Sequence, residues 1–392
     1  MSDPRATRVA GFGTSVFTEM SRLAVEHQAV NLGQGFPDFP GPDFVKEAAI
    51  QAIRADLNQY AVSHGTPRLR RAIAETWKRA YGRELDPENE VSVGSGATEL
   101  ILDAVLGLVN PGDEVIVFEP FYDSYLPDIL MAGGVPRFIT LEPPDWRFDR
   151  QRLVNLFGPR TKLLLINTPH NPTGKMFTRE ELEFIGSLCQ EHDVIVLTDE
   201  VYDQIRFDGV QHVPIGTLPG MWERTLTINS TGKTFSMTGW KVGYAVAPPS
   251  LTQAVRAAHQ FVTFSTSTPF QEAMATAMET AARTGYYDQL RREYTARRDL
   301  LARALAGAGL PVLPIQGSYF LLADVRDMGF PDDVSFSRYL TTEIGVAAIP
   351  PSAFYADSSR APLLARFCFA KKEETLRAAA ERLQRLRTSR KL

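Results

Sequence analysis

The chain of 392 residues is 44% apolar and 22% charged, a composition that excludes a disordered or collagen-like protein and indicates a folded one. Its 42 Lys and Arg residues and 46 Asp and Glu residues give a net charge of −4. The chain therefore lacks the strongly basic charge that is typical of proteins that bind nucleic acids or anionic membranes. Because single cores rarely grow beyond about 250–300 residues, we expect two domains, and small-molecule chemistry is the favoured class of function.

Cysteine and histidine usage argues against a metal centre or a disulfide framework. Cys189 and Cys368 form no CxxC pair, and the six histidines are scattered without metal-ligand spacing. Residues 1–10 are polar and charged, and the sequence has no run of 18 uncharged apolar residues. We therefore expect a protein of a reducing compartment, located in the cytoplasm, with no metal, no nucleic-acid partner and no membrane partner.

Short apolar, β-branched runs alternate with segments whose apolar residues recur at helical spacing. This alternation predicts an α/β domain with a mainly parallel sheet over residues 45–285. Within it, Thr178 followed by Glu181 is a capping box that predicts the start of a helix. A looser order then predicts a small α+β domain over residues 286–392, and residues 1–44 are expected to lie against one of the two domains because they have too little apolar content to fold alone. The runs predicted as strands of the large domain are residues 90–94, 114–119, 135–140, 162–167, 193–198, 225–230 and 241–247.

A glycine-rich turn, Gly94-Ser95-Gly96-Ala97-Thr98-Glu99, directly follows the first predicted strand and opens a helix. The N–H groups and the dipole of a helix start favour an anion, so the turn is either a phosphate cradle or a purely structural turn. Glu119 ends the next predicted strand, as an acidic residue does in a dinucleotide-binding unit. However, Glu99 stands at the third glycine position of GxGxxG, which weakens the case for a nicotinamide-dependent dehydrogenase.

Polar groups follow three later strands, at the edge of a parallel sheet where ligands usually bind. Asn171-Pro172-Thr173-Gly174 is either a plain turn or part of such a site, and Asp199 with Tyr202 has the same two interpretations. Lys233 ends the turn Ser230-Thr231-Gly232-Lys233, an unusual place for a solvated charge. It is either a surface lysine or an imine-forming amine whose pKa is lowered by burial or by a neighbouring cation such as Lys241.

Arg366 stands in an apolar run that predicts a strand. An arginine in such a place is either a structural ion-pair partner or a bidentate clamp for a substrate carboxylate. Several aromatic residues are most simply explained as core when each is taken alone: Phe17, Phe36, Tyr60, Tyr122 and Phe264.

In their order along nearly the whole chain, these signals resemble the class I aminotransferases, the fold-type I family that uses pyridoxal phosphate. Segments 31–40, 218–225 and 316–320 are similar to the branch that holds kynurenine aminotransferases, glutamine transaminase K, cysteine-conjugate β-lyases and bacterial methionine aminotransferases. The resemblance implies a seven-stranded large domain, a small domain that residues 1–44 join, and a homodimer. It also implies an enzyme that moves the amino group of a large uncharged or aromatic L-amino acid, of the methionine, glutamine, phenylalanine or kynurenine type, to a 2-oxo acid.

The resemblance further implies the catalytic and cofactor-binding residues. Lys233 would bond covalently to pyridoxal phosphate and shuttle the substrate proton, while Asp199 would pair with the protonated pyridine nitrogen. Tyr202 and Asn171 would hydrogen-bond the phenolic oxygen, and Tyr122 would stack on the ring. The residues implied for the phosphate are Ser95, Gly96, Ala97, Ser230 and Lys241, the last in place of the arginine of many members, together with Tyr60 of the partner subunit.

For the substrate, the resemblance assigns the α-carboxylate to Arg366, helped by Asn171 and the Gly35 backbone. It places four further aromatic residues around the substrate side chain: Phe17, Phe36, Phe264 and Phe354. Ser265 stands where kynurenine-type members often carry histidine, so an aromatic donor loses a stacking partner there. An aspartate-type aminotransferase is disfavoured because no second arginine is evident and a buried, unpaired carboxylate is costly. A cysteine-conjugate β-lyase stays open, because the same residues can support elimination when the substrate carries a good leaving group.

Overall fold

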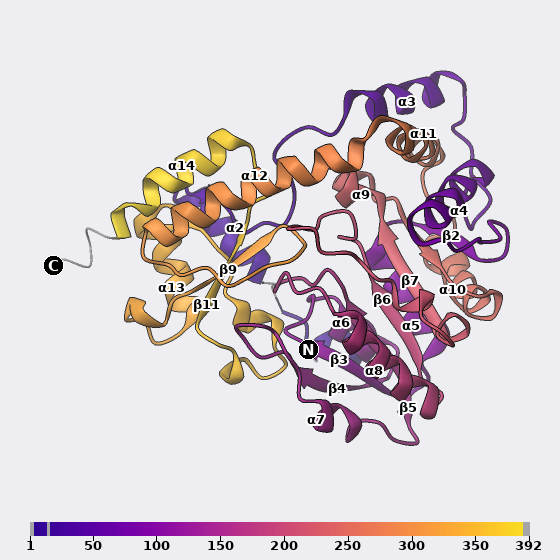
Figure 1. Cartoon of the computed structure of the whole chain (residues 1–392), viewed down its shortest axis with the longest axis horizontal. Helices are drawn as coiled ribbons and strands as arrows, with labels where there is room; N and C mark the ends of the chain where they lie inside the picture. The colour runs from indigo at the N-terminus through magenta and orange to yellow at the C-terminus, as the bar shows by residue number, and fades with distance from the viewer. Residues whose placement is uncertain (1–3, 14–15, 387–392) are drawn as a thin grey trace.

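The computed structural model describes residues 4–13 and 16–386, and a seven-stranded sheet forms the centre of its larger part (Figure 1). The strand order is β2-β8-β7-β6-β5-β3-β4, and every neighbouring pair is parallel except those of β8, which runs antiparallel to both neighbours. The predicted mainly parallel α/β sheet is therefore confirmed. Its strands are β2 (Val91–Gly94), β3 (Glu114–Glu119), β4 (Val135–Thr140), β5 (Thr161–Asn167), β6 (Ile195–Asp199), β7 (Thr225–Ser230) and β8 (Gly243–Val246).

Helices cover both faces of this sheet, which explains why its strands are apolar almost throughout. Successive residues of β6 show the two faces, since Val196 joins one buried cluster and Leu197 joins another. The Leu197 face packs against α5 (Ala97–Leu108), α6 (Tyr125–Met131) and α10 (Pro249–Val262). The Val196 face packs against α7 (Arg150–Val154) and α8 (Arg179–Glu191), and at the β2 and β8 end of the sheet α3 (Asp43–Arg54), α4 (Pro67–Tyr81) and α11 (Thr268–Thr284) complete the cover.

The capping box predicted at Thr178 is present at the start of α8. The Thr178 hydroxyl accepts the Glu181 N–H at 3.1 Å, and the Glu181 carboxylate accepts the Thr178 N–H at 2.9 Å. Two backbone donors that the helix itself cannot satisfy are thus paired, so the helix begins at Arg179.

A second, smaller group of elements follows α12 (Tyr286–Gly307), the long helix that runs between the two parts in Figure 1. Strand β9 (Phe320–Asp324) pairs antiparallel with β11 (Leu364–Cys368), and α13 (Asp333–Tyr339) and α14 (Glu373–Leu383) pack around them. The N-terminal segment reaches this group through a parallel pair of short strands. These are β1 (Val30–Asn31) and β10 (Val346–Ala347). The division of the chain at residues 44 and 285 stays a prediction.

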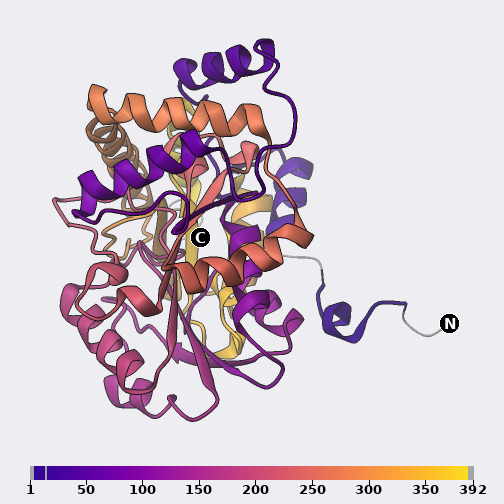
Figure 2. The same cartoon turned by 90° about the vertical axis from the view of Figure 1, so that its right-hand side faces the viewer.

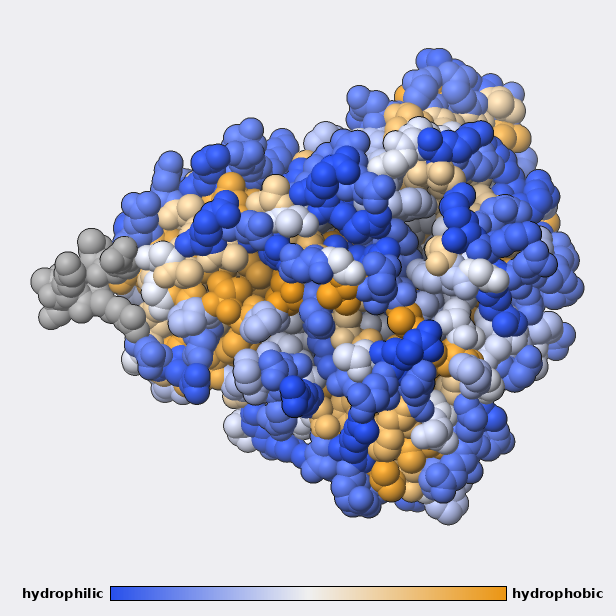
Figure 3. All heavy atoms as spheres, in the orientation of Figure 1, coloured by the Kyte–Doolittle hydropathy of each residue, from blue (hydrophilic) through white to orange (hydrophobic). Residues whose placement is uncertain are grey.

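Two N-terminal helices precede β1. Met20 of α2 (Val16–Glu26) packs against Ile349 and Phe354, which ties this helix to the smaller group. The short helix α1 (Thr7–Ala10) stands out from the side of the molecule, as Figure 2 shows. The face shown in Figure 3 is mostly hydrophilic, with a stretch of apolar residues over the smaller group near β9 and β11. Among the described residues, no helix has both the length and the apolar content needed to cross a bilayer.

Candidate active site

The carboxyl ends of β2, β5, β6 and β7 lie at one edge of the sheet, because these four strands run in the same direction. Ligands of open α/β sheets bind outside this edge. A cavity with about 610 Å³ of empty space lies there. It brings together most of the residues that the sequence singled out for a cofactor: Gly96, Ala97, Tyr122, Asn171, Asp199, Tyr202, Ser230, Lys233 and Lys241.

Lys233 reaches the cavity from α9 (Thr231–Thr234), a short helix directly after β7. The Ser230 hydroxyl accepts the Gly232 N–H at 3.2 Å and thereby caps this helix. The Lys233 Nζ donates to the Tyr319 hydroxyl at 3.1 Å, and that hydroxyl donates to the Gly35 carbonyl at 2.5 Å. Burial lowers the pKa of Lys233 to about 8, so a neutral and nucleophilic amine is accessible near neutral pH.

Asp199 ends β6 and lines the same cavity. The Tyr125 hydroxyl donates to its Oδ2 at 2.6 Å, and the Asn167 amide donates to its backbone carbonyl at 2.8 Å. Burial raises the pKa of Asp199 to about 6, although the Tyr125 hydrogen bond and the charge of Lys233 act in the opposite direction. At neutral pH the cavity therefore holds a buried carboxylate beside a buried amine.

The anion-binding end of the cavity lies at the glycine-rich turn. Gly96 has a φ of 88°, and a Cβ on it would lie 3.2 Å from the Lys241 Nζ, so the turn and the ammonium group are closely packed. The Ser95 and Gly96 amides are already taken, by the Glu99 carboxylate at 2.6 Å and the Gly94 carbonyl at 2.8 Å. The first amides of α5, which have no acceptor within the helix, are left for an anion, and the phosphate role of Ser95 stays a prediction.

Arg366 lies on β11 and is 1% exposed. Its Nη1 donates to the Asn171 Oδ1 at 2.9 Å and its Nη2 to the Gly33 carbonyl at 3.0 Å, while its Nε has no hydrogen-bond partner among the described residues. Burial lowers the pKa of Arg366 to about 10, so the group stays cationic at neutral pH. Three aromatic rings lie within 4.1–5.1 Å of the guanidinium carbon: Phe17, Phe320 and Phe354.

Five of the predicted aromatic residues do not line the cavity: Phe17 and Phe354 lie beside Arg366, and the other three are exposed to solvent. Tyr60 is 82% exposed and packs edge-on against Phe264, with ring centroids 5.2 Å apart, and Phe264 is 41% exposed. Phe36 is 45% exposed and lies 5.0 Å from the Lys371 Nζ. The roles predicted for these three side chains, and for the Gly35 backbone, stay predictions.

A family model described as "Aminotransferase class I and II" matches residues 27–383, which is most of the chain. The chain belongs to this family. The predicted enzyme class, an aminotransferase of the class I and II type, is thereby confirmed together with the fold.

Individual proteins similar to this aminotransferase are also described as aminotransferases. A kynurenine–oxoglutarate transaminase of Dictyostelium discoideum is 42% identical, over 97% of this chain and 96% of the relative. A solved Escherichia coli structure, described with a methionine aminotransferase function, superposes with a TM-score of 0.94 at 43% identity, covering 97% of this chain and 99% of the other. The structure of N-succinyldiaminopimelate aminotransferase from Mycobacterium tuberculosis gives a TM-score of 0.94 at 44% identity, covering 97% and 100%.

The sequence reasoning missed three polar groups of the aminotransferase site: Tyr125, Asn167 and Tyr319. Tyr125 follows Tyr122 by three residues, a helical spacing that places both near one edge of the sheet. Asn167 is the last residue of a buried strand, which was a usable signal for a residue at the ligand edge. Tyr319 lies in segment 316–320, which carries part of the family resemblance. Nothing in its local pattern indicates that its hydroxyl accepts a hydrogen bond from Lys233, 86 positions earlier.

Proposed function

We propose that this aminotransferase uses pyridoxal phosphate to move the amino group of a large uncharged or aromatic L-amino acid to a 2-oxo acid. The observation that carries the proposal is that Lys233, with its lowered pKa, and the buried Asp199 line one cavity whose other end is basic. Perturbed groups of opposite sign in one cavity are typical of an active site.

The cavity fits the cofactor at both ends. At one end the Lys241 ammonium, the Ser230 hydroxyl and the first amides of α5 supply donors for a phosphate. At the other end the Asp199 Oδ1 receives, from the part of the chain that the structure describes, only the Val201 N–H at a long 3.3 Å, so it retains acceptor capacity for a protonated ring nitrogen. The Tyr122 ring lines the wall between them and offers an aromatic face for stacking.

Bound pyridoxal phosphate would supply an electron sink that stabilises negative charge at the substrate Cα. The residues of the chain do the rest. Lys233, once its Nζ is free, takes the proton from the substrate Cα and returns it, a task that suits an amine with a pKa of about 8. Asp199 would hold the ring nitrogen in its protonated form by charge. Tyr202 and Asn171, both on the cavity wall, would donate hydrogen bonds to the phenolic oxygen.

Arg366 is suited to the α-carboxylate that every donor and acceptor shares. Its buried Nε lacks a partner among the described residues, and a carboxylate oxygen would satisfy it. The rings of Phe17 and Phe354 beside the guanidinium favour an uncharged substrate side chain. A second carboxylate next to these rings, unpaired, would cost several kcal/mol. We therefore favour methionine, glutamine and phenylalanine as donors, with kynurenine in the same class.

A homodimer is part of the proposal, with a second copy of the chain covering the exposed apolar residues around Tyr60. Phe261 is 89% exposed and Val62 is 52% exposed, close in sequence to the exposed Tyr60–Phe264 pair. A surface of this kind is typical of an interface. Tyr60 would then reach the phosphate in the partner subunit, and Phe264 the substrate pocket of the partner. A cytoplasmic location is also proposed, since Cys189 and Cys368 are both unpaired and buried.

A donor panel tests the proposed function. The purified enzyme is loaded with pyridoxal phosphate and supplied with each amino acid at equal concentration and one 2-oxo acid. We expect the highest kcat/KM with methionine, glutamine or an aromatic donor. The highest value with aspartate or N-succinyldiaminopimelate would refute the substrate class, and ammonia with pyruvate from a cysteine conjugate would identify β-lyase activity.

Ser265 provides a test of the pocket itself. Its hydroxyl donates to the Ala61 carbonyl at 3.2 Å, next to the Tyr60–Phe264 pair. A Ser265→His variant that gains on kynurenine but not on methionine would support this pocket, and an equal change with both donors would contradict it.

A further inference from the structure

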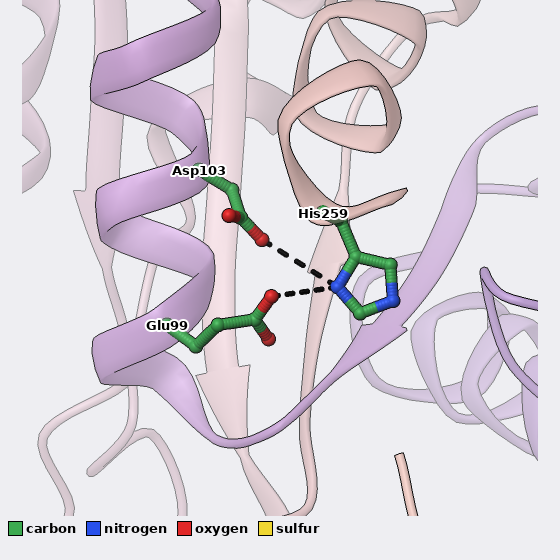
Figure 4. A group of neighbouring side chains, drawn as sticks. All are labelled: Glu99, Asp103 and His259. Atoms are coloured by element: carbon green, nitrogen blue, oxygen red, sulfur yellow. Dashed lines mark hydrogen bonds and ion pairs between the residues drawn. The ribbon is translucent and has the colours of Figure 1, made fainter. Parts of the chain in front are cut away.

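Three titratable side chains, two of them buried and one partly buried, cluster behind the glycine-rich turn, outside the cavity itself. Figure 4 shows Glu99 and Asp103, one turn apart on α5, pointing toward His259 near the end of α10. The His259 Nδ1 lies 2.6 Å from the Glu99 Oε1 and 3.6 Å from the Asp103 Oδ2. None of these residues has a role in the chemistry described above, yet Asp103 and His259 are buried and the Glu99 side chain is only 9% exposed.

The hydrogen bonds of His259 indicate that it is an imidazolium. Its Nε2 lies 2.8 Å from the Ser63 carbonyl, which can only accept, so this nitrogen carries a hydrogen. Its Nδ1 faces two carboxyl groups, and a hydrogen there makes the bond to Glu99 a charge-assisted one. Burial alone would lower the pKa of His259, but its interactions with Asp103 and Glu99 raise it to about 10.

This imidazolium connects two segments that the proposed function places at the cofactor phosphate. On one side, the Glu99 Oε2 accepts the Ser95 N–H at 2.6 Å, and the next residues of that turn line the cavity beside Lys241. On the other side, Ser63 belongs to the segment that carries the exposed Tyr60. A displacement of His259 would therefore move both the turn of its own subunit and the residue proposed to reach the partner's phosphate.

The positive charge of His259 also compensates the negative charge of Glu99 near the proposed phosphate site. A Glu99 carboxylate, one hydrogen bond from the turn, would repel a phosphate unless a cation balances it. His259 supplies that cation, and its hydrogen bond holds the pKa of Glu99 below its usual value although burial opposes this. Burial raises the pKa of Asp103 to about 7, so this carboxyl carries only part of a charge at neutral pH.

We propose that His259 is a positioning residue for the cofactor phosphate, acting through Glu99 on the Ser95–Gly96 turn and through Ser63 on the Tyr60 segment. The inference rests on the proposed use of pyridoxal phosphate. It assigns the cluster a role in cofactor retention. Because His259 acts on segments proposed to hold the phosphate, its loss should weaken binding of the phosphate and leave binding of the ring nearly unchanged.

The test measures two dissociation constants on the cofactor-free dimer by equilibrium dialysis, one for pyridoxal phosphate and one for pyridoxal, which lacks the phosphate. In His259→Gln the side-chain amide nitrogen takes the place of Nε2 and keeps the bond to Ser63. In His259→Asn it takes the place of Nδ1 and keeps the bond to Glu99.

Because His259→Gln loses a charge-assisted hydrogen bond, we expect its dissociation constant for pyridoxal phosphate to rise at least about tenfold and that for pyridoxal to change less than about threefold. His259→Asn should fall between the wild type and His259→Gln.

Glu99 supplies the rescue experiment. Glu99→Gln can accept the Ser95 N–H and donate to a neutral His259, so it should stay within about threefold of the wild type for both ligands, whereas Glu99→Ala should resemble His259→Gln. Thr252→Val is a matched control: Thr252 is buried on α10 and its hydroxyl donates to the Ala247 carbonyl at 3.0 Å, away from the cluster, so neither constant should change.

The possible results separate the two proposals. A wild-type chain that binds no pyridoxal phosphate would refute the proposed function. Normal wild-type binding with equal losses for both ligands in His259→Gln, or with no loss for either, would overturn the positioning role alone. Stoichiometric Zn²⁺ in the purified protein that is lost in Glu99→Ala would also overturn it, because the cluster would then be a metal site.

Discussion

Replacing Asp199 with asparagine should stabilise the cofactor-free chain while it removes the charge that the proposed chemistry needs. Burial raises the pKa of Asp199 from 3.8 to about 6. At about 1.4 kcal/mol per pKa unit, this rise costs the folded chain about 3 kcal/mol whenever the carboxyl is ionised. Asparagine is nearly the same size and can still accept the Tyr125 hydroxyl, so the variant escapes that cost and keeps the hydrogen bond.

The pH dependence gives this prediction its sign. The folded pKa lies above the unfolded one, so between pH 4 and pH 6 the folded chain binds more protons and wild-type stability falls as pH rises. We expect the stability of Asp199→Asn relative to the wild type to grow through this window by up to about 3 kcal/mol and to level off above pH 6.

Urea unfolding of both cofactor-free proteins at several values between pH 4 and pH 7, followed by tryptophan fluorescence, measures the difference. Asp145→Asn is the control, because Asp145 lies in an exposed ion pair with Arg147 at 3.6 Å and should show no comparable trend. A stability difference for Asp199→Asn that is constant across this pH range would refute the reasoning. Turnover of the loaded variant should at the same time be strongly reduced, because nothing would hold the ring nitrogen protonated.

Three other substitutions follow from the site. Lys233→Ala should lose nearly all turnover but still bind pyridoxal phosphate without a covalent bond, and borohydride labelling of another lysine in the wild type would contradict the assignment. Arg366→Lys should raise KM for donor and acceptor alike by about 10-fold to 100-fold, since a charge-assisted, two-point contact with the carboxylate is lost. A change in KM for only one of the two substrates would argue against a shared carboxylate site. Gly96→Ala should weaken the binding of pyridoxal phosphate more than that of pyridoxal. The φ of 88° at Gly96 disfavours a side chain, and the Cβ would lie 3.1 Å from the Lys241 Cε. Equal binding of pyridoxal phosphate by variant and wild type would contradict this.

The sequence alone carried the features that depend on neighbouring residues. Apolar runs that alternate with helical spacing predicted the mainly parallel sheet, and the Thr178 capping box marked the start of α8, because periodicity and capping act within a few residues. The order of the motifs around Asp199 and Lys233 was enough to reveal the resemblance to the family, and the position of these motifs after parallel strands indicated a ligand site at one edge of the sheet.

Only the tertiary structure decided which distant groups meet. Tyr125 donates to Asp199 across 74 positions, and His259 reaches Glu99 across 160. No local pattern encodes either pair, because the first depends on how α6 packs on the sheet and the second on how α10 packs against α5. The tertiary structure also separated the aromatic residues that the sequence had grouped, with Phe354 fully buried beside Arg366 and Tyr60 exposed at the surface. An aromatic side chain has the same apolar pattern in a core, a pocket or an interface, so its place depends on what packs against it.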